Sequence, residues 1–217
     1  MAGRGVTIGA VERTVQLRDG SAIAVRPIEP EDREALARGF ERLGPESRYR
    51  RFHSPIDRLT EAQLDYLTVV DHVDHEALAA FHEGEIVGVA RYVRTEPGPR
   101  AEVAVTVGDD WQGRGVGRAL LDLLTSRARE EGVQTFTAQV LGTNLPMVEL
   151  LSSLGEVRAS PYEHGRRDLE IALEGDSLPT LLRHAATGML SFLARLRPDP
   201  EGLPRSLRKE GRPRRRE

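Results

Sequence analysis

Apolar residues follow two different spacings along the chain, and the two spacings alternate from segment to segment. Apolar and polar residues alternate over 14–17 and 21–26, on either side of Arg18-Asp19-Gly20, which predicts a β-hairpin. We expect further strands at 77–82, 85–94, 101–107, 133–140, 156–159 and 168–173. Apolar residues at helical spacing predict helices over 30–43, 46–52, 59–70, 115–131 and 144–154. Because strands and helices are intermixed, the pattern predicts an α/β or α+β fold.

Residues typical of helix ends mark several of these boundaries. Pro30 is followed by two acidic residues and predicts a helix start, because proline suits the first helical position and acidic groups suit the first turn. Thr60 is a suitable N-terminal cap, and Gly132 suits the left-handed residue that ends a helix. The pair Gly44-Pro45 is expected to end the first helix.

The chain is predicted to contain one ordered domain with appendages. Residues 1–13 are expected to form a flexible lead-in, 14–174 the domain, 175–197 an amphipathic C-terminal helix, and 198–217 a disordered tail rich in arginine and proline. The amphipathic helix suits packing on the domain or on a second copy, so a homodimer through it stays open. A membrane-surface role for this helix is the weaker alternative.

Composition is typical of a soluble globular protein, with 39% hydrophobic and 30% charged residues among 217. The net charge of −3 gives no reason to expect a specific nucleic-acid partner or an anionic membrane surface. The absence of cysteine excludes disulfides, a cysteine nucleophile and cysteine-ligated zinc. No apolar run approaches the roughly 20 residues of a membrane span, and 1–10 lacks the apolar stretch of a secretory signal. We therefore expect a cytoplasmic protein.

A glycine-rich segment lies between a predicted strand and a predicted helix, which is the order that a phosphate site needs. The first N–H groups of a helix have no partner within it, and the helix dipole adds partial positive charge at this end. Glycines let a ligand approach the backbone closely, and two arginines add charge. The expected cofactor-binding residues are Gln112, Gly113, Arg114, Gly115, Val116, Gly117 and Arg118. The simpler alternative is an ordinary glycine-rich turn.

Two other phosphate-binding motifs do not fit this segment. A dinucleotide fingerprint needs a third glycine, or an alanine, three residues after the second glycine. Counted from Gly113 that position is Arg118, and counted from Gly115 it is Leu120. A P-loop needs a lysine before serine or threonine, and the chain's single lysine is Lys209. What remains in the segment is the pattern Q-x-x-G-x-G.

This pattern and its surroundings resemble the GNAT superfamily of N-acetyltransferases, whose acetyl-CoA pyrophosphate loop reads Q/R-x-x-G-x-G/A. The resemblance runs from about residue 15 to 173. Within the superfamily, three stretches are similar to the bacterial Pat-type protein lysine acetyltransferases: SRYRRFHSP (47–55), GVARYVR (88–94) and AEVAVTVGDDWQGRGVGRALL (101–121). The resemblance implies the GNAT fold, a mixed and mostly antiparallel central sheet of six to seven strands, splayed at the cofactor slot and flanked by helices. It also implies acetyl-CoA as co-substrate.

The same resemblance implies where the pantetheine arm of the cofactor lies. In GNAT enzymes this arm pairs with the backbone of the strand before the loop, which here is formed by Val105, Thr106 and Val107. That strand splays from its neighbour, here 133–140, and leaves a slot for the cofactor. Asn144 corresponds to a residue that often contacts the cofactor.

Glu102 is the candidate general base. Side chains alternate along a strand, so Glu102 shares a face with Ala104 and Thr106, and a carboxylate on an otherwise apolar strand needs a rim position or a function. A lysine of pKa about 10.4 is neutral only about once in a thousand at pH 7.4, so a base contributes about 10²–10⁴-fold. In Pat-type enzymes a glutamate at the matching position is taken as the base; the alternative is an exposed glutamate at a strand end. The usual place of the GNAT general-acid tyrosine holds Leu150 and Leu151.

These residues predict an acetyl-CoA-dependent N-acetyltransferase. We expect transfer to a primary amine, first of all the ε-amino group of a lysine in a protein substrate, by direct attack with Glu102 as base. The alternatives are acetylation of a small amine and a non-catalytic acyl-CoA sensor.

Two other charged segments have simpler interpretations. The spacing in Asp71-His72-Val73-Asp74-His75 fits no metal motif, so no metal is expected, although a place in the acceptor cleft stays open for either histidine. The cluster of Arg48, Arg50 and Arg51 suits an acidic acceptor surface or, equally, a solvated helix face.

Overall fold

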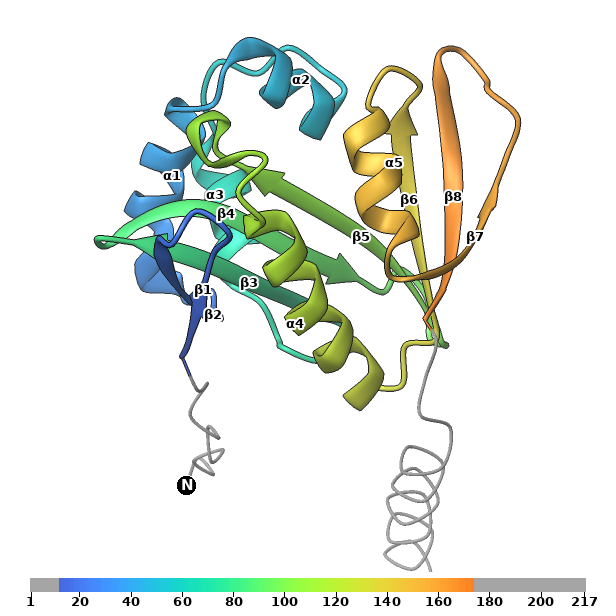
Figure 1. The fold of residues 1–217 in the computed structure, drawn as a ribbon, viewed down its shortest axis with the longest axis horizontal. Coiled ribbons are helices and arrows are strands. Elements are labelled where there is room, and N and C mark those ends of the chain that lie inside the picture. The colour runs from blue at the N-terminus through green and yellow to red at the C-terminus, as the bar shows by residue number, and fades with distance from the viewer. Residues whose placement is uncertain (1–11, 174–217) are drawn as a thin grey trace, which may run out of the picture. The chain divides into compact units, whose positions relative to one another are not determined.

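The computed structural model describes residues 12–173, and their strands form one eight-stranded sheet (Figure 1). The strands are β1 (Arg13–Gln16), β2 (Ala22–Pro27), β3 (His75–His82), β4 (Glu85–Val93), β5 (Arg100–Val107), β6 (Thr135–Leu141), β7 (Gly155–Ala159) and β8 (Arg166–Leu173). They lie in the order β1-β2-β3-β4-β5-β6-β8-β7, and all neighbours are antiparallel except the parallel pair β5 and β6. The expected mixed, mostly antiparallel sheet is confirmed. The expected six to seven strands are one or two too few, because short strands at both edges, β1 and β7, pair into the same sheet.

Helices cover both faces of this sheet. They are α1 (Arg33–Glu41), α2 (Pro45–Phe52), α3 (Glu61–Thr68), α4 (Val116–Glu130) and α5 (Leu145–Ser152). Figure 1 shows α4 running across one face, where Leu120 and Leu124 are fully buried in the main apolar core. On the other face α1 and α3 bury Leu36 and Leu64 in a second apolar cluster around Ile28. The sheet therefore separates two cores.

The ends of the helices agree with most of the local signals. Thr60 caps α3 through a reciprocal pair of hydrogen bonds with Gln63, and Gly132 follows α4 with a left-handed φ of 81°. Pro30 begins a single 3₁₀ turn, and α1 itself begins at Arg33. The pair Gly44-Pro45 was expected only to end the first helix, but α1 ends earlier and the proline is the first residue of α2, a position that its fixed φ favours.

The parallel strands β5 and β6 separate after a short contact, which confirms the expected splay. Only Arg100–Glu102 of β5 pair with β6, where they lie opposite Thr135–Thr137. Beyond that point β5 continues to pair with β4 as far as Val107, and β6 continues to pair with β8 as far as Leu141. Figure 1 shows the two strands diverging from there. We call the space between them, beyond Glu102, the fork.

The described residues include strands near both ends of the predicted domain, 14–174. β1 starts at Arg13, one residue before the predicted start at 14, and β8 ends at Leu173. The predictions for 1–11, for the amphipathic helix at 175–197 with its homodimer, and for the tail at 198–217 lie outside the described residues. Among the residues that the structure describes, none of the helices has the length and apolarity needed to cross a membrane.

Candidate active site

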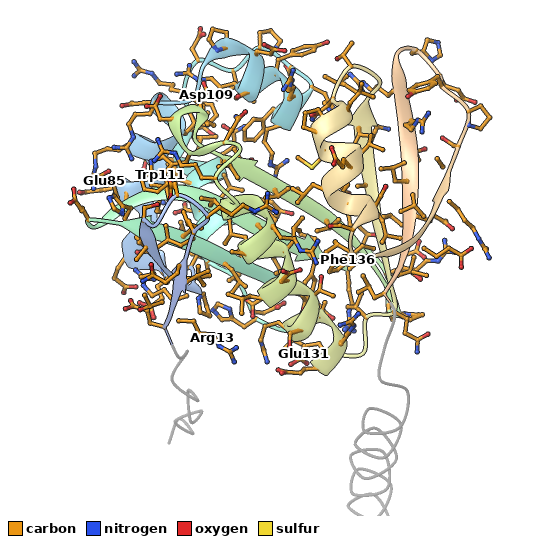
Figure 2. All side chains as sticks on the ribbon, in the orientation of Figure 1. Arg13, Glu85, Asp109, Trp111, Glu131 and Phe136 are labelled. Carbon is orange, nitrogen blue, oxygen red and sulfur yellow. The ribbon has the colours of Figure 1, made fainter. Side chains whose placement is uncertain are left out.

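The connection between β5 and α4 turns through two left-handed glycines. A 3₁₀ turn at Asp109–Trp111, whose first and last side chains are labelled in Figure 2, leads into 112–118, which we call the phosphate loop. Gly113 has a φ of 73° and Gly115 a φ of 104°, and open space lies where a side chain would project from either. Gly115 is the N-cap of α4, and no side-chain hydrogen bond caps this helix within the described residues. The first N–H groups of α4 are thus available to an anion.

Side chains from the preceding turn and from α2 hold the phosphate loop in place. Gln112 Nε2 donates to the carbonyl oxygen of Val107 at 3.2 Å, to Asp109 Oδ1 at 3.1 Å and to Ser47 Oγ at 3.3 Å. Asp109 accepts the backbone N–H of Gly44 at 2.7 Å and the hydroxyl of Ser47. The start of α2 and the phosphate loop therefore form one hydrogen-bonded unit, which sequence reasoning did not identify.

The two arginines of the phosphate loop each face a carboxylate. Arg114 lies 4.8 Å from the ring centroid of Trp111, and its Nη1 is 3.3 Å from Asp19 Oδ2. Arg118 Nε donates to both carboxylate oxygens of Asp122, at 2.7 and 2.9 Å. The expected free positive charge over the loop is thus partly balanced within the chain. An anion at this loop would therefore be attracted mainly by the N-terminus of α4.

Two further residues of the loop, Val116 and Gly117, lie against the interior of the protein. Val116 is 1% exposed and belongs to the main core. A Cβ added to Gly117 would lie 3.1 Å from Leu150 Cδ2, so glycine lets α4 approach α5 closely here. Only the backbone of these two residues can contact a ligand at the loop.

The strand that leads to the phosphate loop has one unpaired edge. The segment Val105–Val107 pairs with β4 on one side, and on the other it borders the fork, where no strand of the described domain pairs with it. Val105 is buried in the core, and Thr106 projects to the opposite face. Asn144, which is buried, follows β6 on the other side of the fork and begins α5. The open edge can pair with a chain of amide groups, and the loop beyond it can bind phosphate.

Glu102 lies where the fork begins. It is paired with Thr137 of β6 and with Val93 of β4, and it is exposed. The buried residues Val103 and Val105 face the core under α4, so Glu102 faces the other side of the sheet, as expected from strand alternation. The carboxylate is near enough to Arg51 and His53 for their charges to interact.

His53 is a further titratable group beside the fork that sequence reasoning did not single out. It follows α2 with a left-handed φ of 52°. Partial burial lowers the pKa of His53, and the nearby cations Arg166 and Arg51 lower it further, against an opposing interaction with Gln139. The imidazole is therefore held toward its neutral form next to Glu102.

A pocket lies on the same face of the sheet as Glu102, between α1, α2, α3 and the strands β4 and β5. Most of its wall is apolar, and its charged members are Arg51 and Arg91, so we call it the arginine pocket. The other lining residues are Leu36, Gly39, Phe40, Leu43, Phe52, Leu59, Leu67, Ile86, Val87, Gly88, Val89, Ala104, Thr106 and Gly108. Its position beside β5 suits an acceptor that approaches Glu102 from this side.

The three arginines of α2 do not form one surface. Arg48 donates to three backbone carbonyls, at 2.8 to 2.9 Å, and so holds the ends of neighbouring segments. Arg50 pairs with Glu46 one turn earlier on the helix. Arg51 alone lines the arginine pocket. The two interpretations of the cluster were a surface that binds an acidic acceptor and a solvated helix face. Neither applies to all three arginines.

The segment 71–75 has structural roles. Asp71 Oδ1 accepts three backbone N–H groups, from residues 73–75, at 2.8 to 2.9 Å. His72 Nδ1 lies 2.8 Å from Oε1 of the buried Glu76. His75 Nε2 lies 3.1 Å from Arg91 Nη1, behind the arginine pocket. Within 12–173 no three such side chains are grouped as metal ligands.

The family model described as the acetyltransferase (GNAT) family matches residues 36–155. The chain belongs to the GNAT acetyltransferase family. The matched range runs from α1 to the first residue of β7 and includes the fork, the phosphate loop and α5.

Individual GNAT relatives cover similar parts of the chain. Acetyltransferase Pat of Mycolicibacterium smegmatis is 40% identical over 146 residues, which are 66% of this chain and 44% of that protein. Acetyltransferase PA5475 of Pseudomonas aeruginosa is 35% identical over 145 residues, covering 65% of this chain and 78% of that protein. The crystal structure of the GNAT domain of S. lividans PAT has a TM-score of 0.70 and 38% identity, covering 75% of this chain and 97% of that one. The chain thus spans less than half of the M. smegmatis relative and nearly all of the S. lividans domain.

Proposed function

We propose that this GNAT domain transfers an acetyl group from acetyl-CoA to the ε-amino group of a lysine in a protein substrate, with Glu102 as general base. The observation that carries the proposal is the position of Glu102 at the start of the fork, on the strand that leads to the phosphate loop. The resemblance of 47–55, 88–94 and 101–121 to Pat-type protein lysine acetyltransferases supports the choice of a protein acceptor, and the similarity to acetyltransferase Pat and to the GNAT domain of S. lividans PAT agrees with it.

The residues around the fork fit acetyl-CoA. The N–H groups at the start of α4 would bind the pyrophosphate, with Gln112 holding the loop and Arg114 and Arg118 flanking it. The open edge of Val105–Val107 would pair with the pantetheine amides, and Asn144 would face the cofactor from the β6 side. When bound, acetyl-CoA supplies the thioester carbonyl that the acceptor amine attacks.

Glu102 would take the proton that the acceptor amine must lose. A lysine ammonium at pH 7.4 is deprotonated about once in a thousand, which corresponds to roughly 4 kcal/mol of free energy. The exposed carboxylate of Glu102 can accept this proton directly or through a water molecule, and solvent can then remove it. The imidazole of His53, held toward its neutral form, lies near Glu102.

The departing thiolate does not need a tyrosine in this domain. The helix that carries this residue in many GNAT enzymes has Leu150 and Leu151 at the corresponding place, and Leu150 instead packs against Gly117. A thiol has a pKa of about 8.5, so its thiolate is a tolerable leaving group near neutral pH. We therefore assign no general acid.

Incubating a bacterial lysate with the protein and isotopically labelled acetyl-CoA, followed by peptide mass spectrometry, tests the proposal. We expect new labelled acetyl-lysines that are absent without the protein and strongly reduced with the Glu102→Gln variant. The chain itself contains one lysine, Lys209, so self-labelling cannot be mistaken for substrate labelling. Label found only on small amines would favour the small-molecule alternative. No label at all, with acetyl-CoA binding intact, would favour the sensor.

A further inference from the structure

Two guanidinium groups line the arginine pocket, and neither forms a salt bridge with a carboxylate of the described residues. Arg51 comes from α2 and Arg91 from β4, and both lie on the wall of this pocket. Within residues 12–173 neither forms a salt bridge with an aspartate or glutamate, whereas several other arginines there do, among them Arg94 and Arg118. Two like charges facing one largely apolar space are costly unless a ligand supplies the opposite charge.

Arg91 is held in place by neutral groups only. Arg91 is 5% exposed. Its Nη2 donates to the carbonyl oxygen of Leu67 at 3.0 Å, and its Nη1 lies 3.1 Å from His75 Nε2. Burial lowers the pKa of His75 to about 4, so the imidazole is neutral at physiological pH and accepts this hydrogen bond. Burial, with a smaller contribution from Arg51, lowers the pKa of Arg91 to about 9, so the group is still charged at neutral pH. Its orientation is fixed while its charge is not balanced.

Arg51 links the pocket to the start of the fork. Its guanidinium carbon lies 5.0 Å from the ring centroid of Phe52, and burial lowers the pKa of Arg51 against the opposing effect of Glu102. In the register of β4 and β5, Arg91 is opposite Ala104 and Val93 is opposite Glu102. Arg91 and Glu102 are therefore diagonal neighbours on one face, about 7–8 Å apart at their backbones.

We infer that the arginine pocket binds a carboxylate carried by the acceptor, so that the enzyme prefers amines with an acidic group beside them. The inference rests on the proposed function, because it assumes an acceptor amine at Glu102. An amine placed at that carboxylate brings its neighbouring group to Arg51, and a carboxylate there receives charge-assisted hydrogen bonds. The carboxylate can come from an acidic residue next to a lysine or from a free amino acid.

Short blocked peptides that differ by one functional group test the preference. Acceptors containing Glu-Lys or Lys-Glu are compared with their Gln-Lys and Lys-Gln counterparts, with acetyl-CoA as donor and both kcat and KM measured. We expect kcat/KM to be about 10–100-fold higher for one of the glutamate peptides, chiefly through KM, as one charge-assisted contact predicts. Equal use of glutamate and glutamine peptides would overturn the inference.

Variants locate the preference. Arg51→Gln and Arg91→Gln should each reduce the ratio between glutamate and glutamine peptides to about one. Arg50→Gln is the matched control, because Arg50 pairs with Glu46 on the same helix and is outside the pocket; it should keep the ratio. Arg51 is only partly buried, so its variant is informative even if Arg91→Gln fails to fold. A ratio that survives in Arg51→Gln would contradict the inference.

Further arms identify the source of the carboxylate and separate the two proposals. If free glutamate and aspartate are acetylated faster than the peptides, and this depends on Arg51 in the same way, the carboxylate belongs to a small acceptor. If the enzyme prefers succinyl-CoA to acetyl-CoA, and this preference depends on Arg51, the pocket binds a carboxylate of the donor and the inference is overturned. If no acceptor is acetylated, glutarate titrated against arginine-¹⁵N-labelled protein still tests the pocket. If glutarate shifts arginine Nε–H resonances, and these shifts are lost in Arg51→Gln, the pocket binds a carboxylate although the proposed function fails. If glutarate causes no shift, both the inference and the proposed function are overturned.

Discussion

Glu102 is paired with Thr137 at the last position where β5 and β6 run side by side. Beyond this pair each strand keeps its other neighbour, β4 or β8, and the two diverge. One strand thus carries an exposed carboxylate at the start of the fork, an open backbone edge along it, and the phosphate loop at its end. The backbone of β5 therefore fixes the proposed base and the proposed cofactor site relative to each other.

Replacing Gly115 by alanine should weaken cofactor binding. Gly115 has a φ of 104° at the N-cap of α4, a conformation that alanine adopts at a cost of roughly 1–2 kcal/mol, and the added methyl group would stand where an anion approaches. We expect the Kd for CoA, measured by isothermal titration calorimetry, to rise about 10-fold or more.

Gly84→Ala is the matched control for this change. Gly84 lies in the turn between β3 and β4, has a φ of 81° and, like Gly115, has no atom within 4 Å of an added Cβ. It should lower thermal stability to a similar extent and leave the Kd for CoA unchanged. Equal CoA affinity in both variants would show that the loop is not the cofactor site.

Removal of the Asp109 carboxylate should loosen the phosphate loop. Asp109→Ala leaves the N–H of Gly44, the hydroxyl of Ser47 and the amide of Gln112 without their shared acceptor. Because these groups are exposed to water, we expect a loss of about 1 kcal/mol in the free energy of unfolding and about a 3–10-fold higher Kd for CoA. Urea unfolding and calorimetry measure the two effects. The exposed neighbour Asp110→Ala should change neither, and an Asp110 effect as large as that of Asp109 would count against this anchor.

The local pattern of the sequence predicted the elements of the fold because each element carries its own signals. The capping box at Thr60 and the left-handed Gly132 are set by neighbours within a few residues, and both were identified from the sequence. The splay between β5 and β6 was expected from the resemblance to the GNAT superfamily rather than from the spacing of apolar residues, and the strand order was not predicted. The role of Pro45 was missed, because a proline stops one helix and starts another equally well.

The parts of the site that could not be predicted depend on contacts between distant segments. Ser47 and Asp109 are 62 residues apart in sequence, and nothing near either indicates the other. Arg91 lies in a strand that reads as an ordinary buried segment, and only the packing of α3 shows that its guanidinium is enclosed. Arg114 and Arg118 were expected to supply free charge, but partners at Asp19 and Asp122 balance them.

The pKa of His75 should make stability depend on pH between about 4 and 6.5. Burial, with a smaller contribution from Arg91, lowers the pKa of His75 from its ordinary value of 6.5 to about 4 in the folded protein. As pH falls through this window the unfolded chain takes up a proton that the folded one does not, so the free energy of unfolding decreases. We expect a loss of about 1–2 kcal/mol, allowing for partial exposure, measured by urea unfolding at pH 7 and pH 5.

His75→Gln isolates this contribution, because the amide oxygen of glutamine can still accept from Arg91 Nη1. The difference in stability between pH 7 and pH 5 should be smaller in this variant than in the wild type. His164→Gln, which removes an exposed imidazole from the loop between β7 and β8, should keep the wild-type difference. An unchanged pH dependence in His75→Gln would contradict the assignment.

The most direct test of the account is Glu102→Gln, assayed for both acetyl transfer and CoA binding. Glutamine keeps the size and exposure of the side chain but cannot take the proton, so kcat/KM for the acceptor should fall about 10²–10⁴-fold while the Kd for CoA stays within about twofold. Glu156→Gln, an exposed glutamate on β7, should retain full activity. Transfer by Glu102→Gln within about threefold of the wild-type rate would contradict the claim that Glu102 is the general base.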